Sequence, residues 1–230
     1  RRYRGMKLRY LGHSGVQLTA GEHDVLIDPF LTGNPKAAAS AADLEPTHIV
    51  VTHAHGDHWG DTPDIARRSG ATVVSCAEIA AHAARLGLTA HGMNTGGRHE
   101  FPFGSVRLTV AFHSSSFDDG RYGGMPNGVV IEIGGVRVYH AGDTALFSDM
   151  RLIGRLGLDV ALLPIGDNYT MGPDDAIEAV KLLEPGLVIP IHYDTMPLLA
   201  QDAALFKSRV EAETSARCAP LAPGDSIDLP

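Results

Sequence analysis

Short apolar runs recur along the whole chain and are separated by polar segments rich in turn residues. The runs contain many β-branched residues and end at Gly, Pro, Asn or Asp, a pattern that predicts β-strands. They cover residues 7–11, 16–18, 25–27, 49–51, 72–74, 106–110, 129–133, 136–139, 160–163 and 187–189. Gly134-Gly135 lies between two of these runs and predicts a two-residue hairpin turn.

Helical patterns lie between the later strands, at residues 62–69, 77–86, 173–183 and 201–213. The first of them has Pro63 in its first turn and Gly70 directly after it, the usual start and stop of a helix. Two polar stretches, 94–102 and 118–127, predict exposed loops. Since no low-complexity linker divides the chain, we expect one domain over residues 6–230. Residues 1–5 are then an expression remnant or a short extension.

The composition is that of a soluble globular protein, with 44% hydrophobic and 20% charged residues. No apolar run approaches the ~20 residues that span a bilayer, so no membrane contact is expected. The net charge of −8 opposes a nucleic-acid partner. The two cysteines, Cys76 and Cys218, lie far from any His-rich motif, which predicts buried thiols in a reducing, cytoplasmic setting.

The strongest chemical motif follows the predicted strand at 49–51. Within six positions it places His53, His55, Asp57 and His58. Neutral imidazoles and carboxylates are the ligands that suit zinc and similar divalent ions. A tight loop behind a buried strand can project all four groups into one small space. The motif therefore predicts a metal centre rather than a solvated polar loop.

Other predicted strands also end at metal-capable residues: His113 follows 106–110, Asp143 follows 136–139, and His192 follows 187–189. In layered α/β proteins, sites form beyond the strand ends, where the loops converge. We therefore expect these side chains to meet His53 at one edge of the sheets.

This set of motifs resembles the metallo-β-lactamase fold superfamily. The matching segments are 25–28, 53–58, His113, 142–144 and 191–193, in the family's order. Segments 11–14, 28–30 and 166–172 are similar to its small metal-dependent hydrolase branch, which includes ascorbate-6-phosphate lactonase-like proteins. The resemblance implies an α/β (α+β) fold, a four-layer αββα sandwich of two mixed β-sheets flanked by helices.

The resemblance also implies the ligand set of two metals. One metal is held by His53, His55 and His113; the other is held by Asp57, His58 and His192; and Asp143 bridges them. Nitrogen and oxygen ligands without a thiolate suit divalent ions of this kind. Zinc is the first choice, and manganese and iron fit the same ligands.

Two metals about 3.5–4 Å apart can hold a hydroxide between them and polarise the bond that it attacks. We therefore expect a hydrolase of a small ester, lactone or phosphodiester, in which Asp57 and Asp143 hold the catalytic metals. Two divalent ions, two carboxylates and one hydroxide leave about one net positive charge, which favours an anionic small-molecule substrate. A homo-oligomer is compatible with the sequence.

Further polar residues have two interpretations each. His13 lies in a Gly-flanked loop and is either a turn residue or a catalytic acid–base group that reaches the metals. Asp28 is expected to orient the ligand loop rather than bind metal. His140 is expected to be a satisfied core histidine. Trp59 is either a pocket wall or core, and the loop 168–170 is either a substrate contact or a turn.

Two other functions compete with the small-molecule hydrolase. One is an RNA 3′-end nuclease of the same superfamily, which the acidic balance and the lack of a large insertion oppose. The other is a non-catalytic metal-binding protein, which is disfavoured because every ligand position is filled.

Overall fold

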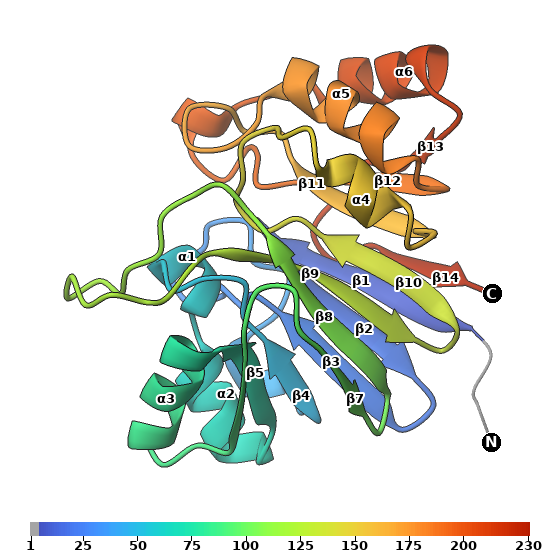
Figure 1. The fold of residues 1–230 in the computed structure, drawn as a ribbon. Helices are drawn as coiled ribbons and strands as arrows, with labels where there is room; N and C mark the ends of the chain where they lie inside the picture. The colour runs from blue at the N-terminus through green and yellow to red at the C-terminus, as the bar shows by residue number, and fades with distance from the viewer. Residues whose placement is uncertain (1–4) are drawn as a thin grey trace.

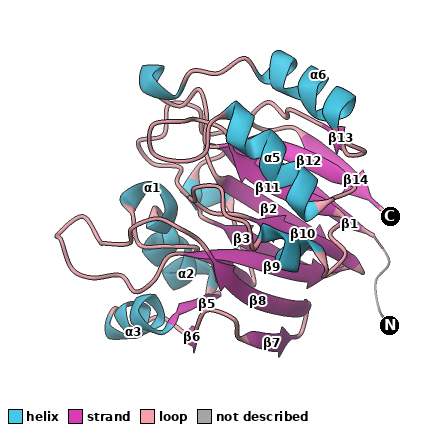
Figure 2. Ribbon diagram, turned by 45° about the horizontal axis from the view of Figure 1, so that its top comes forward, coloured by secondary structure: helices cyan, strands magenta, loops and turns pink. Residues whose placement is uncertain are grey.

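Two sheets packed face to face form the centre of the molecule, and helices cover their outer faces (Figures 1 and 2). The computed structural model describes residues 5–230. The first sheet contains, from edge to edge, β14 (Ser226–Leu229), β1 (Met6–Gly12), β2 (Gly15–Ala20), β3 (His23–Ile27), β4 (His48–Val50), β5 (Thr72–Cys76) and β6 (Ala90–Met93). Strands β14 to β3 pair antiparallel and β3 to β6 pair parallel, so the sheet is mixed.

The second sheet is mixed in the same way. It contains, from edge to edge, β13 (Arg217–Cys218), β12 (Leu187–Ile191), β11 (Val160–Pro164), β10 (Val136–His140), β9 (Asn127–Ile133), β8 (Gly104–Val110) and β7 (Arg98–Phe101). The hairpin between β9 and β10 turns at Gly134 and Gly135, whose φ angles of 61° and 87° confirm the predicted glycine turn.

Helices pack on both outer faces and complete the four layers. The helices beside the first sheet are α1 (Gly56–Trp59), α2 (Thr62–Ser69) and α3 (Ala77–Arg85), and those over the second sheet are α4 (Met150–Gly154), α5 (Pro173–Leu183) and α6 (Ala203–Glu213). Two 3₁₀ turns, η1 (Ala41–Asp43) and η2 (Pro197–Leu199), lie in loops. The predicted αββα sandwich of two mixed sheets is confirmed.

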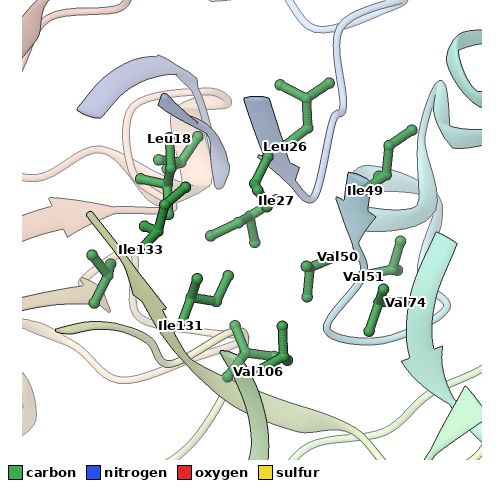
Figure 3. Close-up of a cluster of buried hydrophobic side chains, with 14 of the residues drawn as sticks. Leu18, Leu26, Ile27, Ile49, Val50, Val51, Val74, Val106, Ile131 and Ile133 are labelled. Carbon is green, nitrogen blue, oxygen red and sulfur yellow. The ribbon is translucent and has the colours of Figure 1, made fainter. Parts of the chain in front are cut away.

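The main core lies between the sheets. Figure 3 shows Leu18 and Ile27 of the first sheet opposite Val106, Ile131 and Ile133 of the second. Their side chains are almost fully buried, and each such side chain stabilises the fold by about 1.5–3 kcal/mol. A second cluster joins the outer face of the second sheet to the helices above it. The strand ends that carry the polar motifs are therefore fixed by packing on both sides.

The predicted strands and helices are present, and the main errors concern sheet edges and short elements. The segment 94–102, predicted to be a loop, contains β7, so that prediction was wrong in part. Most β7 side chains are exposed at the sheet edge and include Arg98, His99 and Glu100, so the strand shows no apolar alternation. Strands β6, β13 and β14 and helices α1 and α4 were also missed.

Two further sequence expectations can be compared with the structure. Cys76 and Cys218 are free and buried, which confirms structural thiols. Within residues 5–230, no helix combines the length and apolar character needed to span a membrane. The predicted extension at 1–5 lies outside the described residues except for Gly5, whose N–H donates to Gly134 O at 3.0 Å.

Candidate metal centre

Four strand ends bring the metal-capable side chains together at one edge of the sandwich. His53 follows β4, His113 follows β8, Asp143 follows β10 and His192 follows β12. Because the loops after these strands converge at one edge, residues far apart in sequence become neighbours. The structure thus brings together every side chain predicted to bind metal. Their role as ligands stays a prediction.

The short helix α1 fixes the spacing inside the ligand motif. The N–H groups of His58 and Trp59 both donate to His55 O at 2.9 Å and close the first turn. The His58 side chain is fully buried, whereas the Asp57 side chain remains 32% exposed. Two adjacent residues therefore reach the site from different sides, His58 from the core and Asp57 from solvent.

His53, His55 and His113 form a first group, whose ligand atoms all lie within 4.8 Å of one another. The two nitrogens that face each other most closely are His53 Nε2 and His55 Nδ1, 3.0 Å apart. Three imidazoles at this separation can bind one divalent ion with an open position left over.

Asp57, His58 and His192 form a second group of the same compactness together with His13. Asp143 lies between the two groups. One carboxylate oxygen, Oδ2, is 3.5 Å from His113 Nε2 and 3.1 Å from His192 Nε2, and Oδ1 is 3.2 Å from His58 Nε2. Asp143 thus has the position of a shared, bridging ligand.

Unpartnered buried atoms indicate that a cation belongs here. Among the described residues, the buried side-chain atoms without a hydrogen-bond partner include His58 Nε2, Asp143 Oδ1 and His192 Nε2. These atoms face one another as charges, with His58 Nε2 3.2 Å from Asp143 Oδ1 and His192 Nε2 3.1 Å from Asp143 Oδ2, but without hydrogen-bond geometry. All three belong to the predicted ligand set. A divalent ion would satisfy them, so the residues present fit the metals that the fold implies.

The charges of the site favour ionised carboxylates. Burial alone raises the pKa of Asp143, but His58 and His192 outweigh it and hold that pKa well below its usual range. Burial lowers the pKa of His192, and Asp143 and Asp57 outweigh it and raise the pKa to about 9. In the metal-free protein, imidazolium groups therefore compensate the carboxylates, and metal binding displaces their protons.

Asp28 orients the ligand loop from below. Its carboxylate is fully buried and accepts hydrogen bonds from Thr52 N at 2.8 Å, from Thr52 Oγ1 at 2.6 Å and from His58 Nδ1 at 2.7 Å. A carboxylate accepts only, so His58 carries a proton on Nδ1 and its Nε2 faces the other predicted ligands. Asp28 lies outside every metal-capable group found among residues 5–230, as the sequence predicted.

His140 and Trp59 are also away from the metals. His140 is fully buried, with Nε2 2.9 Å from Ser14 O and Nδ1 accepting from Gly142 N at 3.1 Å, as expected for a satisfied core histidine. Trp59 packs against His82 and Phe117 and does not line the pocket beside the metals.

His13 comes from the loop between β1 and β2 and lies directly behind Asp57. Its Nε2 is 2.9 Å from Asp57 Oδ2, and its Nδ1 is 2.7 Å from Thr195 Oγ1. The ring is 1% exposed and lies 4.1 Å from the His192 ring, centroid to centroid. His13 therefore touches the second ligand group, and its direct contact with substrate stays a prediction.

A pocket of about 570 Å³ opens over the two groups. Its floor is formed by five of the predicted ligands, His55, Asp57, His113, Asp143 and His192. Its walls come from loops and consist of Phe30, Gly33, Pro35, Ser114, Tyr169, Thr195 and Met196. Of the loop 168–170, only Tyr169 is part of this lining. Pockets of ~300–1,000 Å³ hold small molecules, so the site suits a small substrate.

The sequence missed several of these wall residues. Thr195 and Met196 lie only three and four positions after His192, and Phe30 lies two after Asp28. The only indication in the sequence that these residues line the pocket is their closeness to His192 and Asp28. Thr52 lies directly before the His-rich motif, and its contacts with both Asp28 and His53 could not be predicted from that position.

Comparison with known proteins agrees with this geometry. Residues 23–193 match the model of the beta-lactamase superfamily domain. The fold and the donor set define a metal-dependent hydrolase of the metallo-β-lactamase superfamily.

The similarity to individual relatives extends over almost the whole chain. A UPF0173 metal-dependent hydrolase of Thermus thermophilus is 53% identical over 224 residues, covering 97% of this chain and 99% of the relative. The chain belongs to this UPF0173 metal-dependent hydrolase family. The structure of Igni18, a metallo hydrolase from Ignicoccus hospitalis, is 38% identical and has a TM-score of 0.91, over 98% of this chain and 99% of that one.

A more distant neighbour shares the fold alone. The isothiocyanate hydrolase from Delia radicum gut bacteria is 18% identical, with a TM-score of 0.73 over 96% of this chain and 98% of that one. The superfamily and the dependence on metal are thus established, and the number of metals and the substrate are matters for proposal.

Proposed function

We propose that the protein binds two divalent metals and hydrolyses a small ester, lactone or phosphodiester. The observation that carries the proposal is the position of Asp143, whose carboxylate lies within 3.5 Å of His58, His113 and His192 at the floor of a pocket. A carboxylate shared between two groups of imidazoles is what a two-metal site requires.

Each group would hold one metal. His53, His55 and His113 would hold the first, Asp57, His58 and His192 the second, and Asp143 both. When bound, two divalent ions supply Lewis acidity at the scissile bond and an activated water. In the reaction, the oxygen of water bonds to the carbonyl carbon or phosphorus, the bond to the leaving oxygen breaks, and that oxygen takes up one proton. Zinc is the first candidate, with manganese and iron as alternatives.

The surrounding residues hold the ligands in place. Asp28 keeps the Nδ1 proton of His58, and Thr52 Oγ1 lies 3.0 Å from His53 Nδ1. Such partners fix ring orientation and tautomer. His13 reaches the pocket through two lining residues, Asp57 and Thr195. We therefore place His13 as a positioning residue whose influence on turnover passes through them.

The reacting group of the substrate carries or develops negative charge in this proposal. The two-metal centre has about one net positive charge when its ligands and the water-derived group are counted, which stabilises an oxyanion. A carboxylate or phosphate oxygen next to the scissile bond would be favoured for the same reason.

The decisive experiment is metal analysis of purified protein followed by assays with lactones, carboxylic esters, phosphodiesters and RNA. We expect two divalent ions per chain and turnover of one of the small-molecule classes. His53→Ala and Asp143→Ala should lose metal and activity together. Protein that takes up no zinc, manganese or iron after reconstitution would refute the site assignment, and turnover of RNA alone would point to the nuclease.

A further inference from the structure

The walls of the metal-site pocket are mainly apolar, although its floor is polar. Phe30, Pro35, Tyr169 and Met196 form the apolar part of the walls, and Ser114 and Thr195 form the polar part. Tyr169 and Met196 are large apolar side chains that remain 56% and 46% exposed. Apolar side chains grouped around a polar reaction centre are typical of a site that covers them with a ligand.

The same pocket offers no positive side chain to a substrate. Among residues 5–230, no Lys or Arg lines it, and Lys36 lines a separate pocket with Tyr10 and Tyr193. A phosphate or carboxylate away from the scissile bond would therefore meet apolar side chains and a few hydroxyl groups instead of a cation. Hydroxyl groups alone replace the hydration of an anion poorly, so such a charge is disfavoured there.

Backbone conformation and hydrogen bonds within the protein hold the Tyr169 wall in position. The loop before Tyr169 turns through two consecutive left-handed residues, Asp167 at φ 61° and Asn168 at φ 53°. Met171 N donates to Thr144 O at 3.0 Å and ties this loop to the residue after Asp143. Left-handed conformations of non-glycine residues cost free energy and persist where surrounding structure fixes them.

Two more wall residues, Phe30 and Met196, are held in place through His13. The Phe30 ring stands edge-on to the His13 ring, 5.7 Å between centroids and 81° between planes. Thr195, the residue before Met196, bonds the same imidazole at 2.7 Å. A preformed apolar wall reduces the entropy lost when a ligand binds.

We propose that the substrate is a carboxylic ester or lactone whose acyl part is uncharged and apolar, and that Tyr169 and Met196 bind this acyl part. The inference rests on the proposed hydrolase function and narrows it. Water adds its oxygen to the acyl carbon, the bond from that carbon to the leaving oxygen breaks, and the leaving oxygen takes up one proton. The second proton of water is released to solvent, and the apolar chain of the carboxylate product would lie against Tyr169 and Met196.

The test uses the zinc-loaded protein and p-nitrophenyl esters that differ only in their acyl group: acetate, butyrate, hexanoate and the adipate monoester. Each buried methylene gains about fourfold in transition-state binding, so kcat/KM for hexanoate should exceed that for acetate by on the order of 100-fold. The adipate monoester, as long as hexanoate but negatively charged at its end, should react at least about tenfold more slowly than hexanoate. Equal rates for acetate and hexanoate, or faster reaction of the adipate monoester, overturn the proposal.

Variants assign the effect to the walls. Tyr169→Ala and Met196→Ser should each lower the hexanoate-to-acetate ratio by about tenfold, whereas Tyr169→Phe should keep it, because the ring and not the hydroxyl makes the contact. Leu205→Ala is the matched control, since Leu205 is 56% exposed on α6 and does not line the pocket. An unchanged ratio in both wall variants contradicts the assignment.

A binding measurement separates this inference from the proposed function. Calorimetry should show hexanoate binding on the order of 100-fold more tightly than acetate, with the difference reduced in Tyr169→Ala and Met196→Ser. If none of the esters is hydrolysed but the chain-length preference in binding remains, the hydrolase proposal fails and the apolar site stands. If the esters are hydrolysed without preference in rate or binding, the apolar site fails and the hydrolase stands.

Discussion

Replacing Asp28 with Asn tests whether the buried carboxylate controls the metal centre. Asn has nearly the same shape, so packing is preserved. Asp28 Oδ1 accepts from Thr52 N, while Oδ2 accepts from both Thr52 Oγ1 and His58 Nδ1. In Asp28→Asn the amide oxygen can keep the first bond, and the amide NH₂ then faces two groups that previously donated.

The conflict is relieved if His58 moves its proton from Nδ1 to Nε2. His58 Nε2 would then carry a hydrogen where a metal ligand needs a lone pair. We expect metal affinity at the second group to fall by about 10–100-fold. Losing hydrogen bonds to a buried charge costs about 1.5–3 kcal/mol each, so the metal-free variant should be about 3 kcal/mol less stable. That corresponds to a melting temperature about 6–12 °C lower.

The assays are metal content by mass spectrometry, zinc titration followed by calorimetry, and thermal unfolding with and without chelator. Wild-type protein should bind two zinc ions, and Asp28→Asn should bind one tightly and one weakly. The first group, His53, His55 and His113, does not include His58 and should lose less affinity, because Asp28 reaches it only through Thr52.

Asp61→Asn is the matched control. Asp61 is also a buried carboxylate with two hydrogen bonds, from Leu31 N and Thr32 N, both at 2.8 Å, but it contacts no predicted ligand. It should lose stability and keep both metals. The reasoning is refuted if Asp28→Asn binds two metals with wild-type affinity, or if Asp61→Asn loses the second metal to the same extent.

Three other measurements test separate parts of the argument. His13→Ala should keep two metals, lower the melting temperature by a few degrees because a buried side chain is lost, and reduce turnover by about 10–100-fold, the usual effect of losing a residue that positions a ligand. Metal loss would make His13 a ligand, and unchanged turnover would make it purely structural. Removing metal with chelator should lower the melting temperature of the wild type by several degrees, because metal binds the native state; an unchanged curve after verified removal would uncouple the site from folding. Burial lowers the pKa of His48 to about 4, so protonation favours the unfolded chain, and stability should fall as the pH drops from about 6.5 and level off near 4. Because His48 is only partly buried, the free energy of unfolding should fall by about 1 kcal/mol from this group. Denaturant titrations at pH 7 and pH 5 measure the effect: between these two pH values, His48→Gln should lose about 1 kcal/mol less stability than the wild type.

The interior of the fold could be predicted from sequence because its strands are buried on both faces. Residues 49–51 and 160–163 are continuous apolar runs for this reason, and each lies in the middle of a sheet. The edge strands β7 and β14 could not be predicted in the same way. None of their side chains is buried, so the sequence shows no apolar pattern there. These segments are strands because they pair with β8 and β1.

The candidate ligands could be predicted because each one follows such a buried strand. The pocket walls could not, since they depend on how separate loops meet. His192 N donates to His13 O at 2.8 Å across nearly the whole length of the chain, and this contact places Thr195 beside His13. The sequence around His13 gives no indication that this residue pairs with His192.

The same residue types that bind metal also turn the chain at this edge. Left-handed backbone is found at His13 (φ 56°), Asp28 (φ 45°), Asp167 (φ 61°), Asn168 (φ 53°), His192 (φ 55°) and Asp194 (φ 58°). Asn, Asp and His are the non-glycine residues that adopt this conformation most readily. A polar residue at a strand end can therefore redirect the backbone and face the site at once. Replacing His192 or Asp28 by Ala should then destabilise the fold in two ways: the side-chain contacts are lost, and Ala is strained in the left-handed conformation. Replacement by Gly should lose the contacts but avoid the backbone strain. A metal-free His192→Gly variant as unstable as His192→Ala would show that the backbone contributes nothing to that loss.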